Sequence, residues 1–581
     1  MFLRSSRESA SSERRSETYP GLCSRLAKHG VISSLLGRAS VGGASRDPPG
    51  LGSASTSRCT ATRPSPLPSP RETERRPNVL FIISDQHNAK VLGHKGHPDV
   101  RTPNLDQLAA EGVRCDNAIT QNPICTPSRV SFLSGQYCHN HGYYGLSGPH
   151  PGGLPTILGH FRRAGYRTGA IGKIHCPEYW VEDDCDYFRE VYPECSVGGA
   201  PEYTEYLQAR GVLADRDDER YPEQPPGLGQ NLDGRASRLK YEDSVEAWVV
   251  RETIQFMTQA VADGHPFLVQ ASLPRPHQIY APSEPFWSMY DESQLTLPPN
   301  AEYDMSLKAP HLRAMAERHR LGDWTLFEPR TFEAGRLRKL HGYLGAVSQV
   351  DRAVGDVLAW LREHGLEEDT IVIYTADHGE YACEHGIMEK APGICADVVM
   401  RIPFIWRWSG RFRAGHVATE IVEAVDLSTT LCALAGLAPF QTSDGQDLSH
   451  LLRGESGEVH KLGVTEFAWS KSVRKGRYRY VYYPPEMFPD EYPDGFGELY
   501  DLTHDPWEMD NLYFRPEYAR VVRELKDDLL EWLITTTRPV TTHGLPPLGG
   551  AQAITRYKHS VNRDGKVHPD RIRAMRQRTY L

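Results

Sequence analysis

Eight side chains with catalytic or metal-binding chemistry lie close behind short apolar segments, or near a predicted helix start, in this chain of 581 residues. Carboxylates are hard oxygen ligands for divalent cations, and fixed lysine and arginine charges stabilise anions. Histidines transfer protons near neutral pH, and a cysteine becomes a nucleophile once it is activated. This combination predicts a metal-assisted reaction on an anionic group. The residues are Asp85, Cys125, Arg129, Lys173, His175, His277, Asp377 and Lys390.

Asp85 and Asp377 are the predicted metal ligands, because they follow two different apolar segments and their hard oxygens suit Ca²⁺ or Mg²⁺. Gln86 adds a carbonyl oxygen, and the imidazole of His378 shifts the preference toward Mn²⁺. Cys125 is the remaining candidate ligand, although its thiol is a poor match for hard oxygen ligands. Either aspartate alone could instead cap a helix or lie on the surface, and His378 could support a ligand without binding the metal itself.

Cys125 lies in the run Asn-Pro-Ile-Cys-Thr-Pro-Ser-Arg, residues 122–129. Thr126-Pro127 is typical of a helix start, so Cys125 is expected near the positive end of a helix. Arg129 lies one turn further on the same face, where it can donate hydrogen bonds to residue 125. The alternative for Cys125 is a half-buried free thiol.

The segments that must position these residues alternate between buried strands and amphipathic helices. This alternation predicts an α/β fold with a large mixed, mostly parallel sheet sandwiched by helices. Ligands gather at the carboxyl ends of strands in such sheets, which is where the polar groups fall. The predicted strands cover residues 79–83, 167–171, 267–271 and 370–374, and the predicted helices residues 102–110, 158–163, 244–261 and 350–361.

The domain organisation follows from changes in composition. Residues 1–76 are rich in Ser, Arg, Gly and Pro and are predicted to be a disordered leader. The catalytic α/β domain is predicted at 77–440, and a smaller C-terminal α+β subdomain at 441–540. Its strands are expected at 463–467 and 478–482, with a turn at Lys475-Gly476, and a helix near 518–534; a basic tail follows at 541–581.

Composition excludes several classes of protein. The net charge of −9 combines +7 in residues 1–76, +6 in residues 556–581 and −22 between them, so nucleic-acid binding is not expected. The sequence contains no run of about 18 apolar residues, so a membrane span is not expected. Eleven cysteines without a Cys-x-x-Cys pair predict free thiols and a cytoplasmic location. His139 and His141 are expected to be structural, since ligands so close in sequence rarely converge on a metal without further partners.

The pattern Cys125-x-Pro-x-Arg129 resembles the signature of the type I sulfatases of the alkaline phosphatase superfamily. The stretches 78–145, 154–175 and 369–404 are similar to that family in order and spacing, and Glu498-Leu-Tyr-Asp-Leu502 with Asp505-Pro resembles its C-terminal subdomain. The paired aspartates and the asparagine of many members are replaced here by Asp85-Gln86 and by His378.

The resemblance implies a metal-dependent sulfuric ester hydrolase in which a formylglycine-generating enzyme converts Cys125 to formylglycine (3-oxoalanine), whose hydrated aldehyde attacks sulfur. One divalent metal ion is implied, with Ca²⁺ favoured over Mn²⁺ or Mg²⁺. Lys173 and Lys390 would contact the sulfate, His277 would protonate the leaving alcohol, and His175 would act as the base of the second step.

Two alternatives remain open. Gln86 and His378 resemble the phosphonate monoester hydrolases and phosphodiesterases of the same superfamily, and a non-catalytic binding protein would keep Cys125 unconverted. The expected substrate is a small-molecule sulfate ester of unspecified identity, and a homo-oligomer is possible in solution. Tyr179-Trp180 and Phe286-Trp287 could line its pocket or pack in the core.

Overall fold

The computed structural model describes residues 76–146, 153–177, 179–191, 201–216, 234–320, 332–390 and 395–538. The predicted leader, apart from Arg76, and the predicted basic tail at 541–581 lie outside the described residues. All described residues belong to one compact unit. None of the helices in these ranges is long and apolar enough to cross a membrane.

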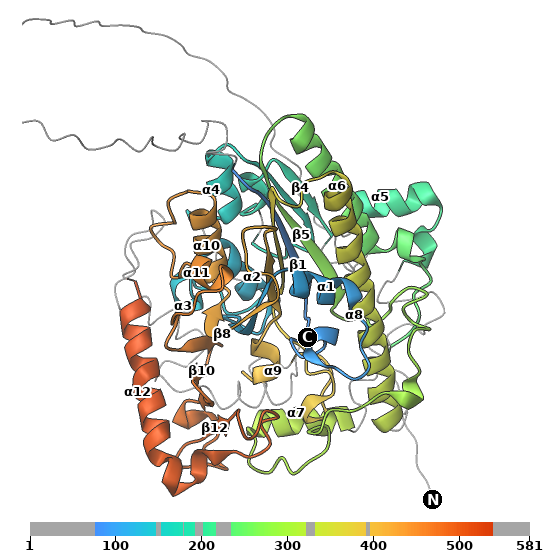
Figure 1. Ribbon diagram of the computed structural model, residues 1–581. Coiled ribbons are helices and arrows are strands. Elements are labelled where there is room, and N and C mark those ends of the chain that lie inside the picture. The colour runs from blue at the N-terminus through green and yellow to red at the C-terminus, as the bar shows by residue number, and fades with distance from the viewer. Residues whose placement is uncertain are drawn as a thin grey trace, which may run out of the picture. The chain divides into compact units, whose positions relative to one another are not determined.

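A mixed sheet lies at the core of the described residues (Figure 1). It has eight strands in the order β4-β3-β5-β1-β6-β7-β2-β8. Only β7 runs antiparallel to its neighbours β6 and β2; the other described strand pairs of this sheet are parallel. The predicted mixed, mostly parallel sheet is therefore confirmed. The strands are β1 (Asn78–Asp85), β2 (Val113–Ile119), β3 (Arg167–Gly172), β4 (Tyr187–Glu190), β5 (Phe267–Pro276), β6 (Thr370–Ala376), β7 (Phe404–Arg407) and β8 (His416–Glu423).

Helices cover both faces of this sheet, which explains why its central strands read as continuous apolar runs. In β1, Val79, Phe81 and Ile83 pack on one face, and Leu80 and Ile82 pack on the other. Burial of each such side chain contributes about 1.5–3 kcal/mol. The first face is covered by α2 (Cys125–Ser134), α4 (Ile157–Arg163) and α10 (Asp426–Leu434), and the second by α1 (Pro103–Glu111), α6 (Val245–Ala262) and α8 (Phe332–Glu363) (Figure 1).

Further helices in the described ranges are short or lie at the edges of this core. They are α3 (Cys138–His141), α5 (Pro201–Arg210), α7 (Pro310–Arg320), α9 (Asp397–Met400) and α11 (Ser449–Leu452).

A second, antiparallel sheet follows in the C-terminal part, in the order β12-β11-β10-β9. It consists of β9 (Gly463–Glu466), β10 (Lys471–Lys475), β11 (Tyr478–Tyr482) and β12 (Gly497–Asp501), and α12 (Ala519–Thr536) packs on it through Leu525 and Leu529. The predicted α+β subdomain is thus present, with the turn at Lys475-Gly476 joining β10 to β11. The strand β10 was not predicted, and the domain boundary at residues 440/441 stays a prediction.

Two glycines let the sheet edge approach other backbone closely. Gly172 ends β3 with φ of +100°, and a Cβ there would collide with the Ser272 carbonyl group. A Cβ at Gly379 would collide with the carbonyl group of Val398. These positions turn the chain directly before Lys173 and directly after His378, so both side chains stay at the carboxyl edge of the sheet.

Candidate active site

Four neighbouring parallel strands bring the predicted site residues together. The strands β3, β5, β1 and β6 are adjacent in the sheet, and each ends at the same edge. Lys173 follows β3, His277 follows β5, Asp85 ends β1, and Asp377 follows β6. Cys125 is the first residue of α2, so it lies at that helix's positive end, as expected.

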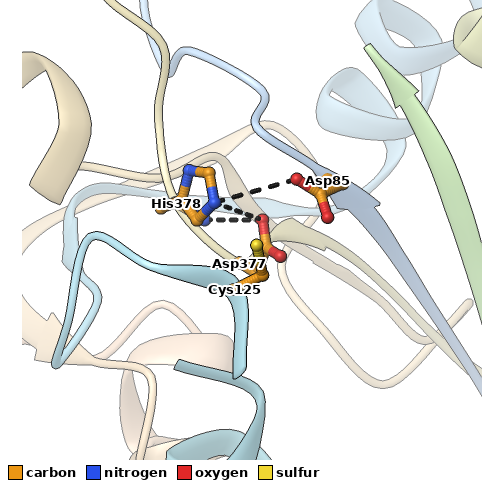
Figure 2. Close-up of side chains that lie close together, drawn as sticks. All are labelled: Asp85, Cys125, Asp377 and His378. Carbon is orange, nitrogen blue, oxygen red and sulfur yellow. Dashed lines mark hydrogen bonds and ion pairs between the residues drawn. The ribbon is translucent and has the colours of Figure 1, made fainter. Parts of the chain in front are cut away.

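Asp85, Cys125, Asp377 and His378 form a cluster of potential metal ligands whose ligand atoms all lie within 4.8 Å of one another (Figure 2). All four side chains are buried. The Nε2 atom of His378 lies 3.7 Å from Oδ1 of both aspartates, and its Nδ1 hydrogen-bonds the Gly379 carbonyl oxygen at 2.9 Å. Because Nδ1 donates there, Nε2 is the ring nitrogen that faces the two carboxylates. Burial lowers the pKa of His378, but the charge of Asp377 raises it above its usual value. A cation bound by the carboxylates would offset that charge and favour the neutral, metal-binding imidazole.

The cluster fits a divalent cation on its own polar atoms. Asp85 Oδ1 is buried and has no hydrogen-bond partner among the described residues. Buried polar atoms are nearly always satisfied, so this carboxylate oxygen, which faces the second carboxylate and His378, indicates room for a further positive partner. Burial and the charge of Asp85 raise the pKa of Asp377, which a cation between the carboxylates would reverse.

Arg129 is buried beside the same carboxylates. Its Nε donates to Asp377 Oδ2 at 2.8 Å, and its Nη2 donates to Asp85 Oδ2 at 3.2 Å. Its Nη1 donates to the Lys173 carbonyl oxygen and, at 2.8 Å, to the Ser272 hydroxyl. Four of its N–H groups thus hold the carboxylates and the β3–β5 edge in place. The predicted hydrogen bond from Arg129 to the oxidised residue 125 stays a prediction.

Lys173 and Lys390 place two ammonium groups at the site. Lys173 Nζ lies 2.9 Å from Asp85 Oδ2, and burial notwithstanding, the charges of Lys173, His277 and Arg129 hold the pKa of Asp85 well below its usual range. Lys390 is buried, and its Nζ donates to the Gln86 side-chain oxygen at 2.8 Å and to His277 Nε2 at 2.9 Å.

His277 has a defined tautomer in this arrangement. Because Nε2 accepts from the Lys390 ammonium group, Nδ1 carries the proton that is donated to the Gln278 carbonyl oxygen at 2.7 Å. Burial and the charges of Lys173 and Lys390 hold the pKa of His277 well below its usual value. A bound anion would offset those two positive charges, and so favour the protonated imidazole.

The side-chain amide of Gln86, which the sequence predicted to bind the metal, is hydrogen-bonded to other side chains. Its oxygen accepts from Lys390, and its Nε2 donates to Gln278 and to Glu380. Metal ligation by Gln86 therefore stays a prediction, whereas its backbone N–H donates to Asp377 Oδ1 at 3.0 Å.

Cys125 is surrounded by groups that stabilise its negative form. Burial and the charge of Asp85 raise the pKa of its thiol, but Lys390 and hydrogen bonds with His175 and His378 outweigh them and lower it well below the usual value. The predicted second-step base, His175, thus lies within hydrogen-bonding reach of residue 125.

Backbone strain is concentrated around this cluster. Gln86, His175 and Glu389 adopt φ values of +65°, +47° and +83°, a region that residues with side chains rarely occupy. Each such conformation costs about 1–3 kcal/mol and persists only where the surroundings enforce it. The strained residues stand beside Asp85 and Lys390 or belong to the site itself, as is common at functional sites.

Glu380 is a site residue to which the sequence assigned no role. It is buried, and its carboxylate accepts hydrogen bonds from Gln86, Tyr280 and the backbone N–H of Ala382 and Glu389. Burial raises its pKa to about 7. Its position two residues after His378 was a signal, but only the fold shows that it anchors the Gln86 amide.

His139, His141 and most of the aromatic residues noted in the sequence contact other side chains of the fold. His139 hydrogen-bonds Glu466 at 2.8 Å and His141 hydrogen-bonds Ser131 at 2.9 Å, as expected for structural residues. Trp180 and Phe286 are buried, and Trp287 stacks on His341, whereas Tyr179 is 62% exposed. These aromatic residues therefore pack within the fold, except for Tyr179.

Comparison with known proteins agrees with the fold and the site. The Sulfatase family matches residues 77–437, and the family described as N-sulphoglucosamine sulphohydrolase, C-terminal, matches residues 383–534. A choline-sulfatase of Rhizobium meliloti is 26% identical over 459 residues, covering 76% of this chain and 84% of its own. An arylsulfatase of Clostridium perfringens is 26% identical over 478 residues, covering 79% and 94%.

The fold is shared with a solved phosphonate monoester hydrolase of Agrobacterium radiobacter, at a TM-score of 0.67 and 23% identity, covering 80% of this chain and 96% of that one. The chain therefore belongs to the sulfatase family, within the alkaline phosphatase superfamily, and is a hydrolase of the class that acts on sulfuric esters.

Proposed function

We propose that this protein is a metal-dependent sulfatase that uses a formylglycine derived from Cys125 as its hydrated-aldehyde nucleophile and releases inorganic sulfate. The observation that carries the proposal is the buried cluster of Asp85, Cys125, Asp377 and His378, with Lys390 and His277 beside it. A thiol is a soft ligand and binds poorly to the hard cation that two carboxylates favour. The hydroxyl oxygens of a hydrated aldehyde are hard ligands, as the carboxylate oxygens are.

One divalent cation would be held by Asp85, Asp377, His378 and residue 125, with Gln86 as a possible fifth ligand if its amide turns. Ca²⁺ suits the two carboxylates best, Mg²⁺ is the other hard cation that they could bind, and the imidazole favours Mn²⁺ as the softer alternative. The cation would supply Lewis-acid stabilisation of negative charge on oxygen. Arg129 keeps both carboxylates oriented through its hydrogen bonds at 2.8 and 3.2 Å.

The remaining residues divide binding and proton transfer between them. The ammonium groups of Lys390 and Lys173 are placed to bind the sulfate oxygens and to stabilise charge that develops on them. The sulfate ester's negative charge raises the proton affinity of His277, whose Nε2 then protonates the departing alkoxide. His175, beside residue 125, removes the proton from that residue's remaining hydroxyl group as sulfate leaves, which regenerates the aldehyde.

The expected partners follow from this mechanism. They are a small sulfate ester as substrate and a formylglycine-generating enzyme for maturation. The eight free cysteines of the described residues support the cytoplasmic location proposed for the protein.

Turnover of a matched pair of esters tests the proposal. We expect 4-nitrophenyl sulfate to be hydrolysed with a higher kcat/KM than a 4-nitrophenyl phosphonate monoester by protein made together with the maturing enzyme. The Cys125→Ala variant should lose both activities, which excludes a contaminating hydrolase. Faster phosphonate turnover would replace the proposal with a phosphonate monoester hydrolase, and no turnover of either ester by aldehyde-containing protein would contradict it.

A further inference from the structure

A cavity with a volume of about 270 Å³ is lined by residues outside the cluster around Cys125. Its walls come from the segment that follows β1, from β2, from the segment that leads into β7, and from Pro506-Trp507. None of the residues that line it belongs to the candidate active site described above. No role in sulfate ester hydrolysis is therefore assigned to it.

Cations outnumber carboxylates among the lining residues. Lys95 and Arg114 share a single oxygen, Oδ1 of Asp116, at 2.5 and 3.1 Å. Lys90, whose Nζ lies 3.0 Å from the Glu384 carboxylate, and Arg401 also line the cavity, and Asp116 is the only acidic residue among the described lining residues. Burial and the charges of Arg401 and Arg114 lower the pKa of Lys95 despite its pairing with Asp116. Positive charge in the cavity is thus not fully balanced, and an anion there would be stabilised.

Arg401 supplies a positive charge that is only partly neutralised. Its Nη2 lies 3.2 Å from Asp397 Oδ2, and that carboxylate also binds Arg474 Nη1 at 2.9 Å. Two guanidinium groups thus share one carboxylate, and an oxyanion in the cavity would offset the remaining charge.

Apolar side chains form the rest of the lining. Leu92, Ile402, Pro403 and Ile405 contribute aliphatic surface, and the indole of Trp507 contributes a flat wall. The Lys90 ammonium group lies 4.2 Å from the centre of that indole ring, which places a cation beside the aromatic wall. Apolar lining with a few convergent charged groups is the usual character of a small-molecule site.

We propose that this cavity binds a small organic anion with one oxyanion group, such as a carboxylate, sulfonate or phosphate, on an apolar body of about one ring. The oxyanion faces the guanidinium group of Arg401 and the ammonium group of Lys95, and the apolar body packs against Trp507 and the aliphatic lining. The proposal does not depend on which ester the active site hydrolyses.

Calorimetric titration of the purified full-length protein with 4-toluenesulfonate tests the site. In the wild type we expect a binding event that Arg401→Gln weakens about tenfold, the effect of losing one charge-assisted hydrogen bond. Asp397 keeps Arg474 in this variant, so its ion pairing is preserved. Arg453→Gln is the matched control, because Arg453 is exposed, pairs with Glu455 and does not line the cavity; it should change nothing.

Two further variants separate the cavity from the active site. Lys390→Met removes a cation of the active site and should leave the event intact, whereas Trp507→Leu should weaken it several-fold. Inorganic sulfate alone should bind at least tenfold more weakly than 4-toluenesulfonate, because it cannot use the apolar lining. Absence of binding at millimolar sulfonate, equal effects of Arg401→Gln and Arg453→Gln, or loss of the event in Lys390→Met would each overturn the proposal.

Discussion

Replacement of Arg129 by methionine isolates the contribution of the buried guanidinium group to the active-site scaffold. The side chains of Arg129, Asp85 and Asp377 are 0% exposed, and methionine fills similar space without any donor. Asp85 keeps Lys173 at 2.9 Å, but Asp377 loses its charged partner. Removing one member of a buried ion pair costs about 3–5 kcal/mol, and the surviving lysine places this variant near the lower end, at about 3 kcal/mol.

The matched control is Arg407→Met. Arg407 is equally buried, with 1% of its side chain exposed, but its partners Glu111 and Glu367 are 39% and 28% exposed and remain solvated once it is gone. We expect a loss of about 1 kcal/mol there. Urea unfolding of both variants and the wild type at pH 7.5, with chelator and then with excess Ca²⁺, measures the difference.

The loss of folding stability in Arg129→Met should depend on pH. The pKa of Asp377 is already raised in the folded state, by burial and by Asp85, and losing Arg129 raises it further. A group with a raised folded-state pKa stabilises the fold below its unfolded pKa and loses that contribution as the pH rises through its folded pKa. The Arg129→Met deficit should therefore be larger at pH 8 than at pH 5, and Ca²⁺ should reduce it at pH 8. Equal deficits for Arg129→Met and Arg407→Met, or an Arg129→Met deficit independent of pH and Ca²⁺, would refute the reasoning.

Three further predictions concern proton transfer, metal binding and a separate ion pair. His277→Gln should lower kcat about 10²–10³-fold for an alkyl sulfate but only slightly for 4-nitrophenyl sulfate, whose leaving group needs no proton; equal losses would contradict general-acid catalysis. A divalent cation at 100 times its dissociation constant should add about 2.7 kcal/mol to the free energy of unfolding of chelated protein, and this gain should be absent in Asp85→Ala/Asp377→Ala. Burial lowers the pKa of His460, but Asp426 and Glu423 raise it to about 9 from 6.5, so His460→Gln should cost about 3 kcal/mol at pH 6 and almost nothing at pH 10; a loss that does not change with pH would show that the residue only packs.

Much of the fold was predictable because its central strands are buried on both faces. The strands β1, β3, β5 and β6 are largely apolar, and each one ends at or directly before an Asp, Lys or His residue; both features are visible without the structure. Six strands escaped prediction: β2, β4, β7, β8, β10 and β12. Among them, β2 contains Arg114 and Asp116, and β10 has the polar sequence Lys-Ser-Val-Arg-Lys.

The candidate site was predictable in its membership but not in its contacts. Adjacent parallel strands deliver Asp85, Lys173, His277 and Asp377 to one edge, and that follows from the order of polar residues after strands. Whether Arg129 faces residue 125 or the carboxylates depends on the packing of α2 against the strand ends. The hydrogen bonds of Gln86 to Lys390 and Glu380 likewise join segments about 300 residues apart, which no local pattern encodes.

The chemical state of residue 125 tests the central claim most directly. Trypsin should release residues 115–129 as one peptide from protein made together with a formylglycine-generating enzyme, and this peptide carries both Cys115 and Cys125. Cys115 is a buried free cysteine outside the site, so it serves as an internal control. We predict an aldehyde at residue 125 and a thiol at residue 115, with sulfate-ester turnover proportional to the aldehyde fraction. A thiol at both positions in protein that hydrolyses sulfate esters would contradict the account.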